Sequence, residues 1–289
     1  MQMMVDERQQ QFQVAPGPLG DVAFRTYGMR EATKLTLVLI HGWLQAGVCW
    51  RRQIPVLAEQ YYVVVVDLPG HGQSAGPTGQ EEEVPPALWS QSVQAVLHTL
   101  RLDETPLVLI GWSFGGVVIS QYVCQYGTQH LRGIVTVGTT LASFAQMPTG
   151  AAQASELMCL LDPSSDAGAR LAAFEQFQRG LTSHPLPQEE YYLTSGYNMV
   201  ALRKLWSISV DWVWSAAATG AEQQVREAGI PTLIIQGTRD AFVPVEVAQS
   251  LHRALPHSTL QLLDCGHSPF LEMPHTFNCT LLNFLDTLS

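Results

Sequence analysis

The sequence predicts an α/β protein with a mostly parallel central sheet, helices on both faces of that sheet, and a helical cap inserted into the chain. Two observations predict the sheet: strand-length runs of apolar, often β-branched residues recur along the chain, and helical segments separate them. Such continuous apolar runs are typical of parallel strands buried on both faces. A third observation predicts the cap, because residues 141–228 contain no convincing strand.

The first part of the chain alternates strands and helices. The segments that we expect, in order, are strands at Phe12–Val14, Asp21–Tyr27 and Leu35–Ile40, a helix from about Trp50 to Glu59, a strand at Tyr61–Val66, a helix at about Pro86–Leu100, a strand at Leu107–Ile110, a helix at Val117–Tyr126 and a strand at Gly133–Val137.

The pattern then becomes helical, with stretches at Ala152–Leu161, Ala167–Gly180 and Tyr191–Trp214. Alternation resumes with a strand at Thr232–Gln236, a helix at Val245–Leu255, a strand at Thr259–Leu263 and a closing helix at Pro274–Leu288. The sequence therefore predicts a core made of residues 11–140 and 229–289 that carries a helical cap made of residues 141–228.

Composition and charge narrow the range of partners. The chain has 289 residues, 46% of them hydrophobic, which suits a large α/β domain with a sizeable core. Its formal net charge of −10 would repel phosphate backbones, so we expect no nucleic-acid partner. No apolar run approaches the roughly 20 residues that a spanning helix needs, so we expect no membrane span.

The sequence lacks the patterns of a signal peptide, of paired cysteines and of common metal sites, and these absences predict the location of the protein and its need for cofactors. The segment Met1–Gln11 is polar and lacks the apolar stretch of a signal peptide. The five cysteines are scattered without C-x-x-C spacing, which favours free thiols in a reducing compartment. We therefore expect a cytoplasmic protein. No H-E-x-x-H motif or cluster of Cys and His appears, so we expect neither a metal ion nor another cofactor.

The most informative segment is Gly111-Trp112-Ser113-Phe114-Gly115. An apolar, strand-like run precedes it and a helical run follows it. This context matches the G-x-S-x-G nucleophile elbow, a strand-to-helix turn so sharp that the serine is strained and exposed. The glycines on either side are expected because any side chain there would collide as the chain doubles back. Ser113 is therefore the predicted nucleophile.

A serine hydroxyl needs a histidine as base and a carboxylate that orients the imidazole. In elbows of this kind the acid and then the histidine follow the serine, on loops at the carboxyl ends of strands. His267 follows the last predicted strand and is the predicted base. Asp240 follows the Thr232–Gln236 strand and is the predicted acid. Asp264 is the second choice, because it lies in or at the end of a strand, and Asp67 is expected to be a structural turn residue.

The tetrahedral intermediate of acyl transfer needs backbone N–H donors, each worth about 2.7–4 kcal/mol of barrier. We expect one donor to be Phe114, directly after the nucleophile. The other is expected to be Trp43, in the loop after the Leu35–Ile40 strand. Aromatic residues should also line an apolar pocket above the serine. The candidates are Trp43, Trp112, Phe144, Trp206, Trp214 and Phe242.

These motifs together resemble those of α/β-hydrolase-fold proteins across nearly the whole predicted core. The residues that carry the resemblance are Ser113, Asp240, His267, His41-Gly42-Trp43 and the segment Asp67–Ser74. Within that superfamily the closest likeness is to carboxylesterases of the pimeloyl-[acyl-carrier protein] methyl ester esterase type. Trp50, Gly111–Gly116, Val135–Val137 and His267–Phe270 are similar to their pattern.

The resemblance implies a serine hydrolase that cleaves a carboxylic ester, with Ser113, Asp240 and His267 as triad, and Trp43 and Phe114 as oxyanion donors. A small, uncharged acyl or aromatic ester is the expected substrate. Acidic residues outnumber basic ones in the range of the cap, so docking to an acidic carrier protein is not expected. We expect a monomer or a homodimer.

Other activities on the same scaffold stay open. N-acylhomoserine lactone hydrolases resemble this chain at the elbow and use the same triad, so the residues do not separate them from esterases. Cofactor-free dioxygenases resemble it at the His41-Gly42-Trp43 loop but tend to place the acid near residue 138, where this chain has Gly138-Thr139-Thr140. A binding protein without catalysis is a further alternative.

Overall fold

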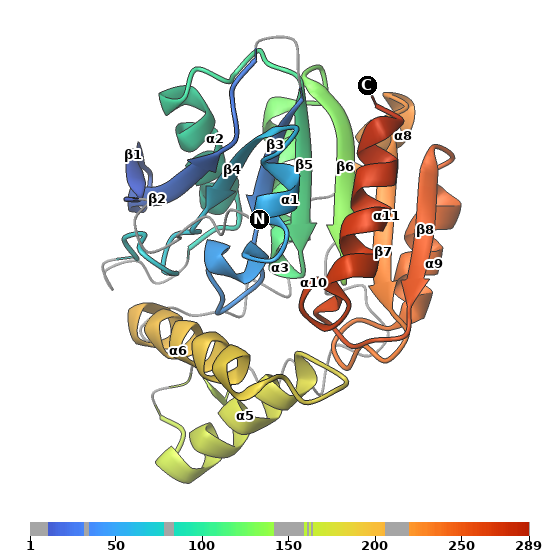
Figure 1. Ribbon diagram of the computed structural model, residues 1–289. Helices are drawn as coiled ribbons and strands as arrows, with labels where there is room; N and C mark the ends of the chain where they lie inside the picture. The colour runs from blue at the N-terminus through green and yellow to red at the C-terminus, as the bar shows by residue number, and fades with distance from the viewer. Residues whose placement is uncertain are drawn as a thin grey trace, which may run out of the picture.

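One eight-stranded sheet runs through the core (Figure 1). The computed structural model describes residues 11–31, 35–77, 84–141, 159–160, 162, 164–205 and 220–288. The strands are β1 (Gln13–Gly17), β2 (Gly20–Tyr27), β3 (Thr36–Ile40), β4 (Tyr62–Val66), β5 (Leu107–Trp112), β6 (Leu131–Val137), β7 (Thr232–Gly237) and β8 (Ser258–Leu263). Their order in the sheet is β1-β2-β4-β3-β5-β6-β7-β8. Only the β1–β2 and β2–β4 pairs of this sheet are antiparallel.

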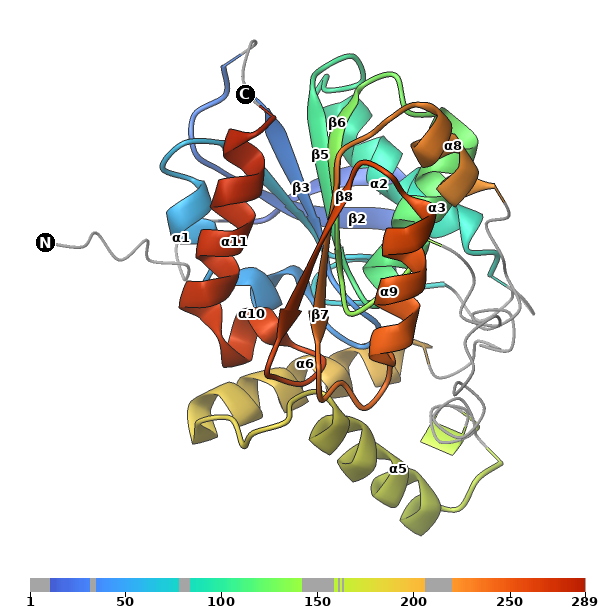
Figure 2. The same ribbon diagram turned by 90° about the vertical axis from the view of Figure 1, so that its right-hand side faces the viewer.

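Helices cover both faces of this sheet (Figure 2). On one face lie α1 (Ile54–Leu57), α10 (Pro269–Glu272) and α11 (Pro274–Asp286), and on the other lie α2 (Ala87–Thr99), α3 (Phe114–Tyr126), α8 (Ala221–Glu227) and α9 (Val245–Ala254). A short 3-10 helix, η1 (Gly47–Trp50), follows β3. The layering confirms the predicted parallel sheet with helices on both sides.

The central strands are apolar because both of their faces are covered. Along β3, Val38 and Ile40 belong to the hydrophobic core on one side of the sheet, whereas Leu37 and Leu39 belong to the core on the other. Successive side chains of a strand point to opposite faces, so a strand between two helical layers must be apolar at every position. All five residues of β3 are buried accordingly.

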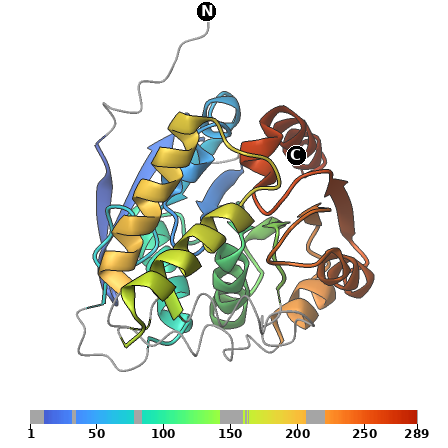
Figure 3. The same ribbon diagram turned by 90° about the horizontal axis from the view of Figure 1, so that it is seen from below.

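The carboxyl ends of the parallel strands share one edge of the sheet. The register places Ile40 of β3 opposite Gly111 of β5, and Trp112 opposite Val137 of β6. The cap helices α5 (Ala167–Gly180) and α6 (Gln188–Leu205) lie across this edge (Figures 1 and 3). Loops that follow β3, β5, β6, β7 and β8 therefore meet beneath the cap.

Helix α6 is fastened to the core near both of its ends. At its start, Arg52 forms an ion pair with Glu190, with 2.8 Å between Nη2 and Oε1. At its end, Lys204 Nζ donates hydrogen bonds to the carbonyls of Gly72 (2.8 Å) and Ser74 (2.7 Å). These contacts span the length of α6, so the helix is held along the loops that follow β3 and β4.

A chain of buried amides links the middle of α6 to the loop after β3. Gln45 Nε2 donates to Asn198 Oδ1, and Asn198 Nδ2 donates to Gln178 Oε1 on α5 at 2.5 Å. Gln178 Nε2 in turn donates to Ser195. All three amide side chains lie in buried residues, where hydrogen bonds are costly to lose.

Several elements differ from the sequence prediction. The expected helix from Trp50 to Glu59 is only the turn η1 and the single-turn α1, because Pro55 has no N–H to continue a helix from the preceding turn. Helix α3 begins at Phe114 rather than at Val117. Helices α8 and α10 were not expected. Helix α8 packs against α3 and α9, so it lies on the core although its sequence falls in the range predicted for the cap.

The prediction of cap helices is only partly covered by the described residues. Helix α5 has the predicted bounds, and Asp166 accepts hydrogen bonds from the N–H groups of Gly168 and Ala169 at its start. The expected helix at Ala152–Leu161 lies outside the described residues except for 159 and 160, which are helical. Residues 206–214 of the expected Tyr191–Trp214 helix also lie outside them. No helix within the described ranges is long and apolar enough to cross a membrane.

Candidate active site

Ser113 is the single residue between β5 and α3. Its φ of 52° and ψ of −117° form a backbone conformation that residues other than glycine rarely adopt. The N–H of Ser113 donates to the carbonyl of Val137 at 2.9 Å, and the carbonyl of Ser113 accepts a hydrogen bond from Thr139 Oγ1 at 2.6 Å. Residues at the end of β6 thus hold the peptide groups on both sides of the strained turn.

Gly111 and Gly115 permit this turn by leaving room for the backbone. A Cβ on Gly111 would lie 2.7 Å from the carbonyl carbon of Gly115, and a Cβ on Gly115 would lie 2.5 Å from the carbonyl oxygen of Ile40. Side chains are essentially never found this close to a backbone atom. The spacing of the motif therefore has a packing cause, as the sequence analysis predicted.

Asp240 lies in the loop after β7, and both of its carboxylate oxygens are occupied. Oδ2 accepts hydrogen bonds from His267 Nδ1 (2.8 Å) and Gln236 Nε2 (2.9 Å). Oδ1 accepts from the N–H groups of Phe242 (2.8 Å) and Val243 (2.9 Å). The side chain is 1% exposed. Four donors therefore fix the carboxylate in one orientation, with one oxygen turned to the imidazole.

His267 lies in the loop after β8, and its surroundings restrain both backbone and ring. Its carbonyl accepts a hydrogen bond from Trp112 Nε1 at 2.8 Å. The Phe242 ring packs edge-on against the imidazole, with 4.9 Å between centroids. Because Nδ1 faces Asp240, the other ring nitrogen, Nε2, is the one turned away from the carboxylate.

The Asp240–His267 pair lies against Gly138, the residue after β6. A Cβ on Gly138 would lie 3.0 Å from His267 Nδ1 and 3.2 Å from Asp240 Oδ2. The preceding residue, Val137, accepts the N–H of Ser113. Within the described part of the chain the Ser113 hydroxyl makes no hydrogen bond. Catalytic hydrogen bonds commonly tighten only when substrate binds.

Two buried histidines cross-link the loops after β3 and β4. His41 Nε2 accepts the N–H of Leu68 at 2.9 Å, and His71 Nε2 accepts the N–H of Leu44 at 3.1 Å. Each Nδ1 lies beside a backbone carbonyl, at 2.7 and 2.9 Å. Because Nε2 accepts in both rings, Nδ1 carries the proton. Leu44 has a φ of 60°, so His71 holds a strained residue directly after Trp43.

The charge state of these histidines follows from their burial. Burial lowers the pKa of His41, and the opposing attraction of Asp67 does not offset it. Burial also sets the pKa of His71 well below its usual range, and the positive charge of Lys204 acts in the same direction. Only a neutral imidazole can accept a hydrogen bond on Nε2. Charge state and geometry therefore agree on two neutral rings.

Asp67 has the structural role expected of it. Oδ1 accepts the N–H of Gly47 at 2.7 Å, and Oδ2 accepts the N–H of Gln73 at 2.9 Å. Its backbone carbonyl accepts the hydroxyl of Ser74 at 2.5 Å. Asp67 therefore joins the far end of the loop after β3 to the loop after β4, away from the Asp240–His267 pair.

Trp43 and Phe114, the residues predicted as oxyanion donors, lie together beside the elbow. Their rings pack edge to face with 4.9 Å between centroids. Phe114 is the first residue of α3, where N–H groups point out of the helix end toward an anion. A Cβ on Gly42, just before Trp43, would lie 3.1 Å from the Cβ of Ser113. Both donors stay predictions.

The residues predicted for the substrate pocket have different environments. Phe242 contacts His267 and the cap residue Phe177, at 5.5 Å between ring centroids. Trp112 is buried and packs edge-on against Phe270, so its contacts support the His267 loop, and its pocket role stays a prediction. Three further candidates, Phe144, Trp206 and Trp214, lie outside the described residues.

Sequence reasoning missed several polar residues that hold the site. The apolar pattern presents Gln236 only as the end of a strand, although an amide in a buried strand just before a candidate acid is a usable signal. His71 lies inside the Asp67–Ser74 segment, where its contact with Leu44 has no signature. Thr139 and Glu272 were not singled out at all. Among the described residues, no group of three or more His, Cys, Asp or Glu side chains is placed to hold a metal ion.

Comparisons with known proteins give a consistent result. Residues 36–274 match a family model described as alpha/beta hydrolase fold. The chain is similar to pimeloyl-[acyl-carrier protein] methyl ester esterases of Vibrio atlanticus (26% identity, covering 86% of this chain and 93% of that protein) and Edwardsiella ictaluri (29%, 88% and 95%). It is also similar to the crystal structure of an esterase, RhEst1, from Rhodococcus sp. ECU1013, with a TM-score of 0.78, 27% identity, and coverage of 96% of this chain and 99% of that one.

Proposed function

The chain belongs to the alpha/beta hydrolase fold family, and from this premise we propose that it hydrolyses a carboxylic ester through an acyl-enzyme on Ser113. The observation that carries the proposal is the 2.8 Å contact between His267 Nδ1 and Asp240 Oδ2, in loops at the same edge of the sheet as the strained serine. A carboxylate so placed keeps the proton on Nδ1 and leaves Nε2 as the base.

In the proposed reaction, His267 Nε2 takes the hydroxyl proton of Ser113 while Oγ attacks the ester carbonyl carbon. Asp240 stabilises the imidazolium that forms. The N–H groups of Trp43 and Phe114 donate to the oxyanion of the tetrahedral intermediate. The intermediate collapses, and His267 gives its proton to the departing alcohol. Water, deprotonated by the same imidazole, then attacks the acyl carbon; the bond to Ser113 Oγ breaks, His267 returns the proton to Oγ, and the acid is released.

We propose a small acyl or aromatic ester as the substrate. The relatives reported above are named as esterases, which supports ester hydrolysis. The Phe242 ring, which is only partly buried and packs on His267, supplies apolar surface there, and the buried rings of Trp43 and Phe114 pack beside the elbow. Because acidic residues outnumber basic ones in the range of the cap, we favour a free small molecule over an ester carried on an acidic protein.

The dioxygenase alternative is not favoured. It places the acid near residue 138, and here that residue is a glycine packed against His267 and Asp240. The acid beside the imidazole comes instead from the loop after β7. The lactone alternative uses the same residues as the esterase, so the assay must include it.

The test is hydrolysis of p-nitrophenyl esters of graded acyl length, with N-acyl homoserine lactones in parallel. Ser113→Ala should lower kcat by about 10⁴- to 10⁶-fold and abolish covalent labelling by a fluorophosphonate. Ser250→Ala, an exposed serine on α9, is the matched control and should keep the wild-type rate. Equal turnover in wild type and Ser113→Ala, or oxygen consumption with a heteroaromatic substrate, would refute the proposal.

A further inference from the structure

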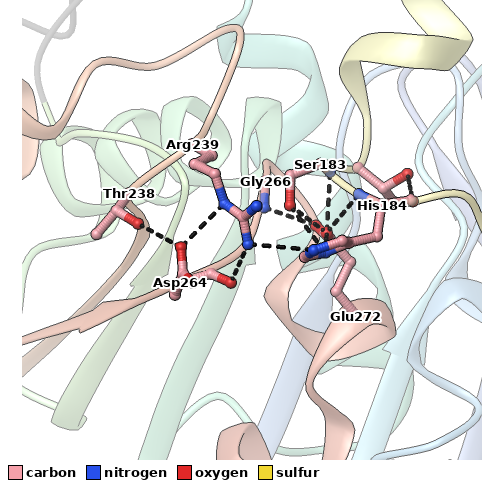
Figure 4. A network of polar contacts seen from close by, with 8 residues as sticks. Ser183, His184, Thr238, Arg239, Asp264, Gly266 and Glu272 are labelled. Carbon is pink, nitrogen blue, oxygen red and sulfur yellow. Dashed lines mark hydrogen bonds and ion pairs between the residues drawn. The ribbon is translucent and has the colours of Figure 1, made fainter.

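Glu272 is a buried carboxylate that the proposed reaction does not use (Figure 4). It is the last residue of α10, and its side chain is 3% exposed. It lies between the loop that carries His267 and the connection from α5 to α6 in the cap. A buried carboxylate costs free energy unless its oxygens are hydrogen-bonded, so its partners identify what it holds.

Each oxygen of Glu272 serves a different part of the molecule. Oε1 accepts the N–H of Gly266, directly before His267, at 2.7 Å. Oε2 accepts the N–H of Ser183 (2.9 Å), the hydroxyl of Ser183 (2.7 Å) and the N–H of His184 (3.2 Å). Ser183 and His184 belong to the α5–α6 connection, so one side chain bridges the cap and the histidine loop.

The cap connection also rests directly on the backbone of Gly266. A Cβ on Gly266 would lie 2.5 Å from the nitrogen of Ser183 and 3.0 Å from Glu272 Oε1. Only glycine allows this approach. The end of α5 touches the same region, because a Cβ on Gly180 would lie 2.6 Å from the ring of Phe242, which packs on His267.

Charged residues surround this bridge on its solvent side. His184 Nδ1 lies 3.4 Å from Glu272 Oε2, and Arg239 Nη2 lies 3.3 Å from His184 Nε2. Arg239 Nε lies 2.9 Å from Asp264 Oδ1. His184 and Asp264 have side chains 60% and 80% exposed, so water screens their interactions. The buried hydrogen bonds of Glu272 therefore carry the connection.

We propose that Glu272 is a positioning residue that couples the cap to the base: it holds the α5–α6 connection and the backbone of His267 as one unit. The inference rests on the proposed role of His267. A displacement of the cap connection is transmitted through the carboxylate to Gly266, and from there to the imidazole. The reactive geometry at Ser113 is thus complete only when the cap is seated.

The first test is Glu272→Gln, which keeps the shape of the side chain but has one acceptor oxygen in place of two. One side of the bridge then loses its hydrogen bonds. We expect kcat per active site to fall about ten- to hundredfold, the effect of a small misplacement of a catalytic group. Active sites are counted by fluorophosphonate titration, so unfolded protein does not enter the rate. Glu246→Gln, at an exposed position on α9, removes the same charge and should keep the wild-type rate.

Hydrogen–deuterium exchange of the free protein tests the bridge without any substrate. In Glu272→Gln, exchange should accelerate both in peptides covering 181–186 and in those covering 264–268. Acceleration in only one of them, or unchanged exchange and kcat, overturns the coupling. If the wild type hydrolyses no ester, the proposed function fails, and the exchange result still decides whether Glu272 joins the two segments.

Gly266→Ala perturbs the same bridge from the other side and covers the case in which Glu272→Gln does not fold. The added Cβ would press against Ser183 and crowd Glu272 Oε1, which separates the cap connection from the loop of His267 while the carboxylate of Glu272 is retained. We expect the same loss of kcat per titrated site and the same paired acceleration of exchange. A Gly266→Ala enzyme with wild-type kcat and exchange would contradict the inference.

Discussion

The loops after β3 and β8 both lie at the sheet edge where Ser113 follows β5, and different chemistry holds each of them. In the first, the neutral imidazole of His71 accepts the N–H of Leu44, next to Trp43. In the second, the carboxylates of Asp240 and Glu272 accept donors from His267 and Gly266. All of these acceptors are buried, so losing their hydrogen bonds is costly on both sides.

The difference matches the charges that the proposed reaction creates on each side. An imidazolium forms beside Asp240, and a carboxylate stabilises it. An oxyanion forms beside Trp43, where a carboxylate in contact would oppose it. Asp67, the carboxylate that contacts the loop of Trp43, accordingly binds Gly47 rather than the backbone next to Trp43. We call the loop that carries Trp43 the oxyanion side and the loop that carries His267 the base side. Removing a charge should lower activity most on the base side, and disturbing the backbone should lower it most on the oxyanion side.

Of the changes that compare the two sides, Asp240→Asn should have the largest effect. The amide cannot replace a carboxylate that accepts from His267, Gln236 and two backbone N–H groups, and it favours the wrong tautomer of the imidazole. We expect kcat to fall about 10⁴-fold, while KM changes little. Steady-state kinetics on the best p-nitrophenyl ester measures both constants, and circular dichroism checks the fold.

Asp264→Asn is the control for this experiment. Asp264 was the second choice for the acid, but its side chain is exposed and pairs with Arg239. The variant should retain wild-type kcat. If Asp264→Asn is inactive and Asp240→Asn is not, the base side is organised differently from the arrangement proposed here.

The second prediction concerns shape on the oxyanion side. His71→Ala leaves the N–H of Leu44 without its acceptor and frees the strained residue next to Trp43. We expect kcat to fall about ten- to hundredfold, because a displaced donor serves the oxyanion poorly. His71→Gln keeps an acceptor that reaches Leu44 and should recover most of the rate. Equal kcat for both variants would show that this contact does not hold the oxyanion side.

The sheet and several helices were predictable because burial leaves a continuous pattern in the sequence. Strand β4 was expected at Tyr61–Val66 and spans Tyr62–Val66, since every apolar position there faces one of two cores. Helix α5 has its predicted bounds. The prediction of a helix at Trp50–Glu59 was wrong, because the apolar spacing there is helical although Pro55 interrupts the helix. The local apolar pattern thus located most elements, but it did not show that the missing N–H of Pro55 would interrupt the Trp50–Glu59 helix.

Within the candidate site, the contact between Asp240 and His267 is the one that follows from topology. Parallel strands bring their carboxyl ends to one edge, so a strand-end Asp240 and a strand-end His267 were expected to meet, and they do. Their supports depend instead on contacts between distant residues: Ser183 and Glu272 are 89 positions apart. No spacing in the sequence records such a pair, so only the folded chain identifies it.

The smallest expected effect is on stability: the two buried histidines that hold the oxyanion side should make the free energy of unfolding depend on pH. The ordinary pKa of histidine is about 6.5, and burial places the pKa values of His41 and His71 below it. Below pH 6.5 the unfolded chain therefore binds protons at these positions that the folded chain does not. As the pH is lowered through that window, the free energy of unfolding should therefore decrease, by at most about 1.4 kcal/mol per pH unit for each histidine.

His71→Gln removes one of these titrating groups while keeping the acceptor for Leu44. Urea unfolding at pH 7 and at pH 5.5 should therefore show a smaller loss of stability for His71→Gln than for wild type. A loss that is the same in both proteins would mean that His71 becomes protonated in the folded state, so that the loop beside Trp43 carries charge after all.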